Sequence, residues 1–155
     1  MIFYFLLTII LLIGAPAVKA ESFSFTQPPS YVIIPTINLS LPVFEAKVAF
    51  NTWEVRLDGA SFGEGTNLPG TFGNTVIFSH ALPHLFGDIP KLKKGDLIHI
   101  FTDVDWFVYT VKETAVVDPE NIEVIFSKGH PELTLYTCTG KNYTKRFIIK
   151  AELST

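Results

Sequence analysis

The chain has 155 residues, a length that fits one domain built around a single core. Hydrophobic residues make up 48% of it and 14 residues are Phe, so burial can offset the entropy lost on folding, which argues against an intrinsically disordered chain. The formal net charge of −3, with no run of Lys or Arg, argues against a nucleic-acid partner, because phosphate backbones bind clustered positive charge. We therefore expect a globular protein that does not bind nucleic acid.

The chain begins with an apolar leader. Residues 1–13 are apolar apart from Tyr4 and Thr8, and small residues follow as far as Ala20. This pattern indicates export, through either a cleaved signal peptide or a short N-terminal membrane anchor. We assign residues 1–20 to this leader, residues 21–30, which are rich in Ser, Pro and Thr, to a tether, and residues 31–155 to one folded domain. We expect the protein to be extracytoplasmic, at the cell surface, and either membrane-anchored or secreted.

The rest of the chain is typical of short β-strands separated by turn residues. The predicted strands are Tyr31 to Ile34, Ile37 to Leu41, Lys47 to Phe50, Trp53 to Leu57, Thr75 to Ser79, Leu97 to Thr102, Trp106 to Val117, Leu133 to Cys138 and Arg146 to Leu153. Turns are expected at 94–96 and 102–105, and short helices only near Pro83 to Ile89 and Pro119 to Phe126. The pattern predicts an all-β barrel or sandwich with one or two short helices.

A Gly-rich stretch from Asp58 to Asn74 interrupts this pattern. It contains five Gly residues and Pro69, which predicts a long loop crossing the surface. Such a loop either carries ligand contacts on a rigid scaffold or is an ordinary solvent-exposed connection.

The chain contains one cysteine, Cys138, which cannot form an intramolecular disulfide. A lone exported thiol is inert in the core, bridges two molecules or is reactive. In its strand Leu133 and Leu135 share one face and Cys138 lies on the other, while in the last strand Phe147 faces the core and Arg146 faces away. Antiparallel pairing of the two strands would bring Cys138 and Arg146 together on the face away from the core.

Cysteine chemistry requires a thiolate, which a neighbouring cation stabilises. Arg146 suits this role, and its fixed charge would also stabilise an oxyanion formed during attack on a peptide carbonyl. Acyl transfer further needs a group that protonates the leaving amine, for which histidine is suited near neutral pH.

Of the four histidines, His80 is the best candidate, because it ends an apolar strand and starts a loop. His84 in the following loop is the reserve, whereas His99 falls in a strand and His130 in a turn. The spacing of His80 and His84 resembles a pair of metal ligands, but no third ligand accompanies it. We therefore expect neither a metal nor a cofactor.

These residues resemble the sortase family. Residues 134–138 read Thr-Leu-Tyr-Thr-Cys and match its Thr-Leu-x-Thr-Cys signature, and Arg146 follows at the spacing of the family's essential arginine. Residues 69–74 and the strand that leads to His80 look like the family's Gly-Asn strand before its catalytic histidine. Ser79 stands where many members have Gly, which we interpret as subclass variation, with class D or E sortases nearest in look. The resemblance covers most of residues 50–153.

The resemblance implies a closed or nearly closed eight-stranded β-barrel, with residues 31–155 as a sortase catalytic domain. It implies that Cys138 attacks a C-terminal sorting motif of an exported protein, typically Leu-Pro-x-Thr-Gly, and forms a thioester. His80 would then protonate the departing amine and later deprotonate an incoming amine from a cell-wall peptide or a protein lysine, while Arg146 holds the substrate and the oxyanion. We expect substrate contacts from the following residues: Ser79, Tyr136 and Thr137.

Two alternatives remain open. The first is a cysteine endopeptidase, in which water resolves the same acyl-enzyme. The second is a non-enzymatic exported β-domain that binds a peptide or a wall component, in which Cys138 is incidental.

Overall fold

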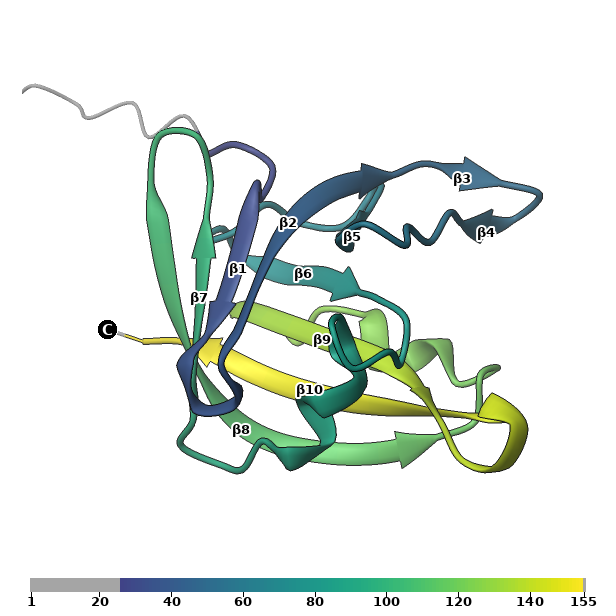
Figure 1. Ribbon diagram of the computed structural model, residues 1–155. Coiled ribbons are helices and arrows are strands. Elements are labelled where there is room, and N and C mark those ends of the chain that lie inside the picture. Colours follow the sequence, from purple (N-terminus) through teal and green to yellow (C-terminus); the bar gives the residue numbers. More distant parts are fainter. Residues whose placement is uncertain (1–25, 155) are drawn as a thin grey trace, which may run out of the picture.

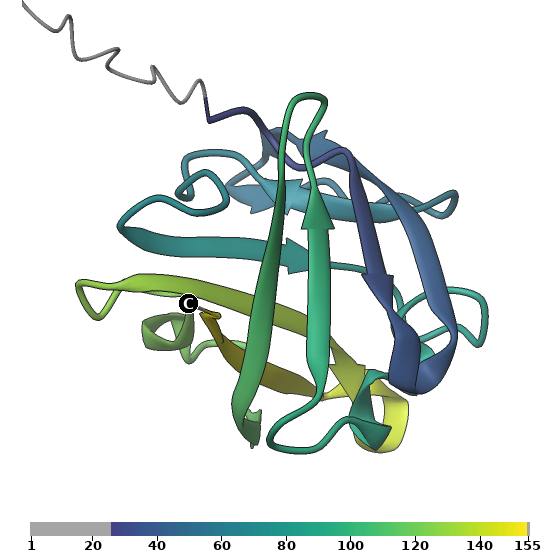
Figure 2. The same cartoon turned by 90° about the vertical axis from the view of Figure 1, so that its left-hand side faces the viewer.

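The computed structural model describes residues 26–154 and shows a closed eight-stranded β-barrel, which confirms the predicted fold. Around the barrel the strand order is β1-β2-β5-β6-β9-β10-β8-β7 (Figures 1 and 2). The barrel strands are β1 (Tyr31–Ile34), β2 (Leu39–Ala46), β5 (Ala60–Gly63), β6 (Gly73–Phe78), β7 (Leu97–Phe101), β8 (Trp106–Val117), β9 (Pro131–Thr139) and β10 (Lys145–Leu153). A separate hairpin consists of β3 (Val48–Ala49) and β4 (Thr52–Trp53).

Four short 3₁₀ helices occupy connections between strands. They are η1 (Pro35–Ile37), η2 (Phe86–Lys91), η3 (Ile122–Ile125) and η4 (Lys141–Tyr143). The helices expected near Pro83 to Ile89 and Pro119 to Phe126 correspond to η2 and η3. The other two were not predicted, because a single helical turn of three residues has no apolar periodicity that a sequence could display.

The apolar faces of the strands point into the barrel, as their alternation predicts. Leu133 and Leu135 of β9 and Ile149 and Ala151 of β10 all belong to the main buried cluster. The predicted turns are also confirmed: Gly95 has a φ of 98°, and the backbone N–H of Thr102 donates to the carbonyl of Asp105 at 2.8 Å.

The predicted surface loop from Asp58 to Asn74 is wrong in its first half. Residues Ala60–Gly63 form β5, which is buried throughout and pairs parallel with β2 and antiparallel with β6. Small residues have low strand propensity, and a strand covered on both faces shows no alternation, so its sequence is typical of a loop. Conversely, the predicted strand from Trp53 to Leu57 ends at Trp53, and Val55 and Leu57 are exposed.

The last residue of the predicted tether belongs to the barrel. The backbone N–H of Ser30 donates to the carbonyl of Phe101 at 2.8 Å, and the carbonyl of Ser30 accepts the N–H of Val43 at 2.9 Å. The predicted leader of residues 1–20 lies outside the described residues. Within residues 26–154, no helix has the length and apolar character needed to cross a bilayer.

Trp53 attaches the β3–β4 hairpin to the barrel. Its indole stacks on Phe78 of β6 with ring centroids 5.4 Å apart, and its Nε1–H donates to the carbonyl of Glu64 at 3.1 Å. The indole also lies flat on Gly63, where an added Cβ would come within 2.7 Å of the ring. Gly63 is therefore needed for space, so that the tryptophan can fix the hairpin against the barrel.

We predict that Gly63→Ala lowers the free energy of unfolding by about 1–3 kcal/mol, because the new methyl group overpacks the contact with Trp53. Urea denaturation measures this loss. In a Trp53→Leu background, where the indole is gone, the same substitution should cost less than about 0.5 kcal/mol. An equal cost in both backgrounds would contradict the proposed role of this contact.

Candidate active site

The outer face of β9 carries the candidate nucleophile. β9 pairs antiparallel with β10, and this register places Cys138 directly opposite Arg146. Side chains directly opposite each other in an antiparallel pair have β-carbons about 4.5–5.5 Å apart. Tyr136 and Ile148 form the adjacent opposed pair on the same face. The predicted juxtaposition of Cys138 and Arg146 away from the core is therefore confirmed.

His80 follows the strand on the other side of β9. β6 pairs parallel with β9 and ends with Phe78 opposite Tyr136, and extending this register by two residues would place His80 beside Cys138. Both residues line one groove. One backbone hydrogen bond and one side-chain hydrogen bond hold the chain just past the end of β6. The N–H of Ser79 donates to the carbonyl of Tyr136 at 3.3 Å, and Oγ1 of Thr137 donates to the carbonyl of Ser79 at 2.8 Å. We call His80, Cys138 and Arg146 the outer row.

The outer row lines a groove of about 660 Å³. Its floor is apolar and comes from the same three strands: Phe78, Tyr136 and Ile148. One wall is the β3–β4 hairpin, and the other is the connection from β8 to β9, which contains η3. In Figure 1 the hairpin and the β9–β10 connection project from the same side of the barrel.

Stacked aromatic rings form part of the groove floor. Phe78 stacks between Trp53 and Tyr136, and its ring centroid lies 4.9 Å from that of Tyr136. Burial raises the pKa of the Tyr136 hydroxyl well above its ordinary value, while the charge of Arg146 acts in the opposite direction. The phenol therefore stays neutral at physiological pH, and it offers an O–H donor within an otherwise apolar floor.

Arg146 is held by the loop that joins β9 to β10. Its Nη1 donates to the carbonyls of Tyr143 at 3.2 Å and Lys145 at 3.1 Å. Asn142 and Tyr143 both adopt the left-handed conformation, with φ of 55° and 58°, and thereby form the sharp turn that presents the Tyr143 carbonyl. Lys145 Nζ also contacts Asp118 Oδ1 at 2.5 Å, which links this loop to the neighbouring wall.

The three residues expected to contact substrate differ in their positions. Tyr136 and Ser79 line the groove, although the hydroxyl of Ser79 donates to the carbonyl of Gly59 at 3.0 Å. Thr137 is only 1% exposed, does not line the groove and donates to Ser79. This hydrogen bond fixes the backbone of the residue that directly precedes His80.

The other histidines lie away from the groove. His84 is exposed in the loop after His80, His99 lies in β7 and stacks on Trp106, and His130 immediately precedes β9. Between residues 26 and 154, no group of three or more His, Cys, Asp or Glu side chains is placed to hold a metal ion.

Sequence reasoning missed the residues that form the walls. Trp53 was identified only as the start of a strand, and Val124 and Ile125 only as part of a short helix, yet all three line the groove. Apolar wall residues have no chemical signature in a sequence. For Trp53, the one available signal was a large aromatic residue ahead of a stretch rich in small residues.

The groove combines a thiol and a guanidinium on two paired strands with an imidazole from the turn after β6. A thiol is a nucleophile once deprotonated, a guanidinium stabilises an oxyanion, and an imidazole transfers protons near neutral pH. The arrangement is therefore suited to acyl transfer through Cys138.

Known proteins that resemble this chain are sortases. A family model described as a sortase domain matches residues 32–154. Sortase A of Bacillus anthracis is 32% identical over 126 residues, which cover 79% of this chain and 58% of the relative. Sortase D of Bacillus subtilis is 27% identical over 128 residues, which cover 79% of this chain and 62% of the relative. The chain thus spans about three fifths of the length of these curated relatives.

Solved structures show the same barrel. Sortase C1 from Streptococcus suis superposes with a TM-score of 0.71 at 32% identity, covering 84% of this chain and 74% of that one. A sortase D5 transpeptidase from Clostridium perfringens superposes with a TM-score of 0.71 at 27% identity, covering 83% and 80%. The class D matches are consistent with the predicted nearness to classes D and E, and classes A and C are also represented. The fold, the signature around Cys138 and a family match that spans the barrel show that this chain belongs to the sortase family.

Proposed function

We propose that the protein is a cysteine transpeptidase that acts at the cell surface. It cleaves a C-terminal sorting motif of the Leu-Pro-x-Thr-Gly kind in an exported protein and transfers that protein to an amine. The observation that carries the proposal is the strand register, which sets Cys138 opposite Arg146 in a groove that His80 also lines. The Thr-Leu-Tyr-Thr-Cys signature and membership of the sortase family support it.

The reaction proceeds in two acyl transfers. In the first, the thiolate of Cys138 attacks the carbonyl of the scissile peptide bond, a C–S bond forms, and the C–N bond breaks as His80 gives a proton to the departing amine. In the second, an amine attacks the thioester, His80 takes up the amine's proton, and the thiolate leaves. Arg146 stabilises the oxyanion in both steps, a contribution of about 3–4 kcal/mol for one such donor.

The remaining groove residues bind or position. Tyr136 and the stacked rings beside it contact the apolar part of the sorting motif, since an apolar floor with one hydroxyl suits such a peptide. Ser79 contacts the peptide only by packing in the groove lining, because its hydroxyl, its N–H and its carbonyl already have hydrogen-bond partners within the protein. Thr137 acts through Ser79 and His80 as a positioning residue.

The partners follow from this activity. The donor is an exported protein with a C-terminal sorting signal, and the acceptor is an amine of a cell-wall peptide or of a protein lysine. The apolar residues 1–20 target the domain for export and, if they are retained, anchor it in the membrane. The two transfers balance in protons and electrons on the protein's own side chains, so no cofactor is required.

We predict that Cys138→Ala abolishes cleavage of a model sorting peptide, and that the wild type forms a new amide product when an amine is supplied. Mass spectrometry of the reaction mixtures measures both. Cleavage at an equal rate by Cys138→Ala would refute the nucleophile assignment, whereas binding of the peptide by the wild type without any cleavage would favour a non-enzymatic binding domain.

The endopeptidase alternative predicts a different response to the amine. If the wild type hydrolyses the peptide at an unchanged rate and forms no amide product at any amine concentration, the protein is a hydrolase and not a transpeptidase.

The role of His80 is tested with His80→Ala. His84→Ala is the matched control, because His84 lies on the same loop but is exposed and outside the groove. We expect loss of cleavage only in His80→Ala.

We predict that Thr137→Val lowers kcat about tenfold and destabilises the fold by about 1 kcal/mol. Valine has nearly the same shape as threonine but no hydroxyl, so the buried carbonyl of Ser79 loses its donor. Thr137→Ser keeps the hydroxyl and should restore kcat to near the wild-type value. Steady-state kinetics and urea denaturation test this pair. An equal loss of kcat in both variants would exclude the hydrogen bond as the cause.

A further inference from the structure

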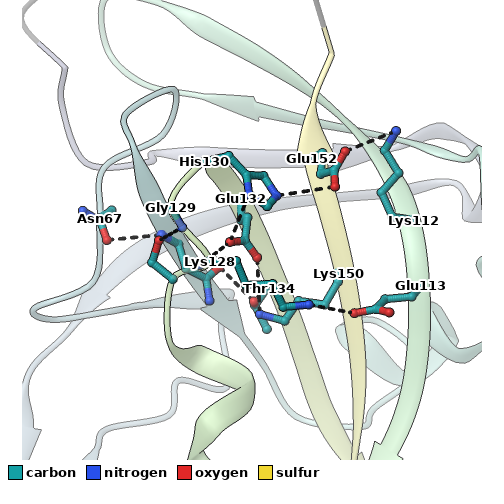
Figure 3. A network of polar contacts seen from close by, with 12 residues as sticks. Asn67, Lys112, Glu113, Lys128, Gly129, His130, Glu132, Thr134, Lys150 and Glu152 are labelled. Carbon is teal, nitrogen blue, oxygen red and sulfur yellow. Dashed lines mark hydrogen bonds and ion pairs between the residues drawn. The ribbon is translucent and has the colours of Figure 1, made fainter.

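A network of polar side chains covers the end of the outer face opposite to the outer row. Figure 3 shows its centre, Glu132 at the start of β9, among Lys128, His130 and Lys150. The side chain of Glu132 is 4% exposed, and that of Lys150 is 11% exposed. A buried ion pair is weak support for a fold, because removing both charges from water costs about as much as their attraction returns. Stability alone therefore does not account for a carboxylate at this position.

Glu132 holds the backbone of the wall segment, which we define as residues 118–130 between β8 and β9. Its Oε1 accepts the backbone N–H of Lys128 at 2.6 Å. Its Oε2 lies 3.8 Å from Nζ of Lys150, which makes no hydrogen bond within the described part of the chain. The ammonium thus balances the charge of the carboxylate, while the backbone of the wall segment receives its hydrogen bond.

Asn74 of β6 provides a second anchor. Its side chain is buried, with Nδ2 donating to the carbonyl of Ile125 at 2.8 Å and Oδ1 accepting from the hydroxyl of Thr134 at 2.8 Å. Buried side chains from β6 and β9 therefore fix one carbonyl and one N–H of the wall segment, at Ile125 and Lys128.

The wall segment does not pack fully against the neighbouring strands. An open pocket of about 200 Å³ lies between residues of the segment, among them Asn121, Glu123 and Val124, and strands β8 and β10. On the outer side, Ile122 and Phe126 are 58% and 57% exposed. Ile125 packs on the buried cluster of Ala46, Val76 and Phe78, and the residues on either side of it depend more on hydrogen bonds to keep one conformation.

We propose that Glu132 and Asn74 are positioning residues that set the donor-peptide wall of the groove by holding residues 118–130. This inference rests on the proposed function. The wall side chains Val124 and Ile125 line the groove next to the fixed carbonyl and N–H. The outer row lies on strands and on the turn after β6, so freeing the wall weakens peptide binding and leaves the chemical step intact.

The test compares Glu132→Met with Glu132→Gln in the full chain. Methionine is of similar length but cannot accept the N–H of Lys128, whereas glutamine keeps an oxygen that can. We expect Glu132→Met to raise the KM for a model sorting peptide about tenfold with kcat changed by less than about twofold, since a buried N–H loses its acceptor. Glu132→Gln should stay within about threefold of the wild-type KM, because it retains the acceptor.

The rate of amide hydrogen exchange in residues 118–130 measures how firmly Glu132 holds the wall segment, independently of activity. We expect faster exchange in Glu132→Met across residues 118–130 and unchanged exchange in β10. Glu45→Met is the matched control, since Glu45 is exposed on β2, and it should change neither the kinetics nor the exchange. If Glu132→Met does not fold, the double variant with Lys150→Met removes the unbalanced ammonium and carries the same expectations.

Two results would overturn the inference: unchanged exchange in the wall segment, or a fall in kcat with unchanged KM. A wild type that neither cleaves nor binds the peptide would instead overturn the proposed function, and the exchange data would still decide whether Glu132 anchors the segment.

Discussion

The position of β9 between a parallel and an antiparallel neighbour is the constraint on which the site depends. Its pairing with β10 fixes Arg146 opposite Cys138, and its pairing with β6 directs the turn that carries His80 into the same groove. If the register of β9 with either neighbour shifted by one residue, a side chain of the outer row would point into the barrel core. The core-facing Leu133 and Leu135 oppose such a shift, because it would expose them. Core packing thus determines the geometry of the candidate chemistry.

The two faces of this part of the sheet serve different purposes. The inner face belongs to the main core, whereas the outer face carries a second buried cluster of Ala46, Val76 and Phe78 beneath the groove. Trp53 and Ile125 pack on that cluster from the two walls. Both walls therefore pack on an apolar cluster that lies beneath the groove. The hydrogen bonds of Asn74 and Glu132 also hold the wall formed by residues 118–130.

Alternation and turn residues were sufficient for an all-β fold and for most strands to within a few residues, and the family resemblance supplied the closed barrel. Alternation also predicted that Cys138 and Arg146 would lie opposite each other. The sequence did not predict β5, whose small residues are buried on both faces. It wrongly predicted a strand through Val55 and Leu57, which are apolar but exposed and not paired with a strand. It also missed the groove walls and the hydrogen bond from Thr137 to Ser79, since both are defined by long-range contacts. Thr137 and Ser79 lie 58 residues apart, and only the closed barrel brings them together.

The most direct test is intact-mass spectrometry of the protein quenched during turnover with a model sorting peptide and no added amine. The account predicts a covalent adduct with the mass of the acyl half of the peptide, mapped to Cys138, that disappears when an amine is supplied and never forms in Cys138→Ala. Turnover of the peptide without any adduct on Cys138, or an adduct on another residue, would contradict the claim that Cys138 is the nucleophile of an acyl-transfer site.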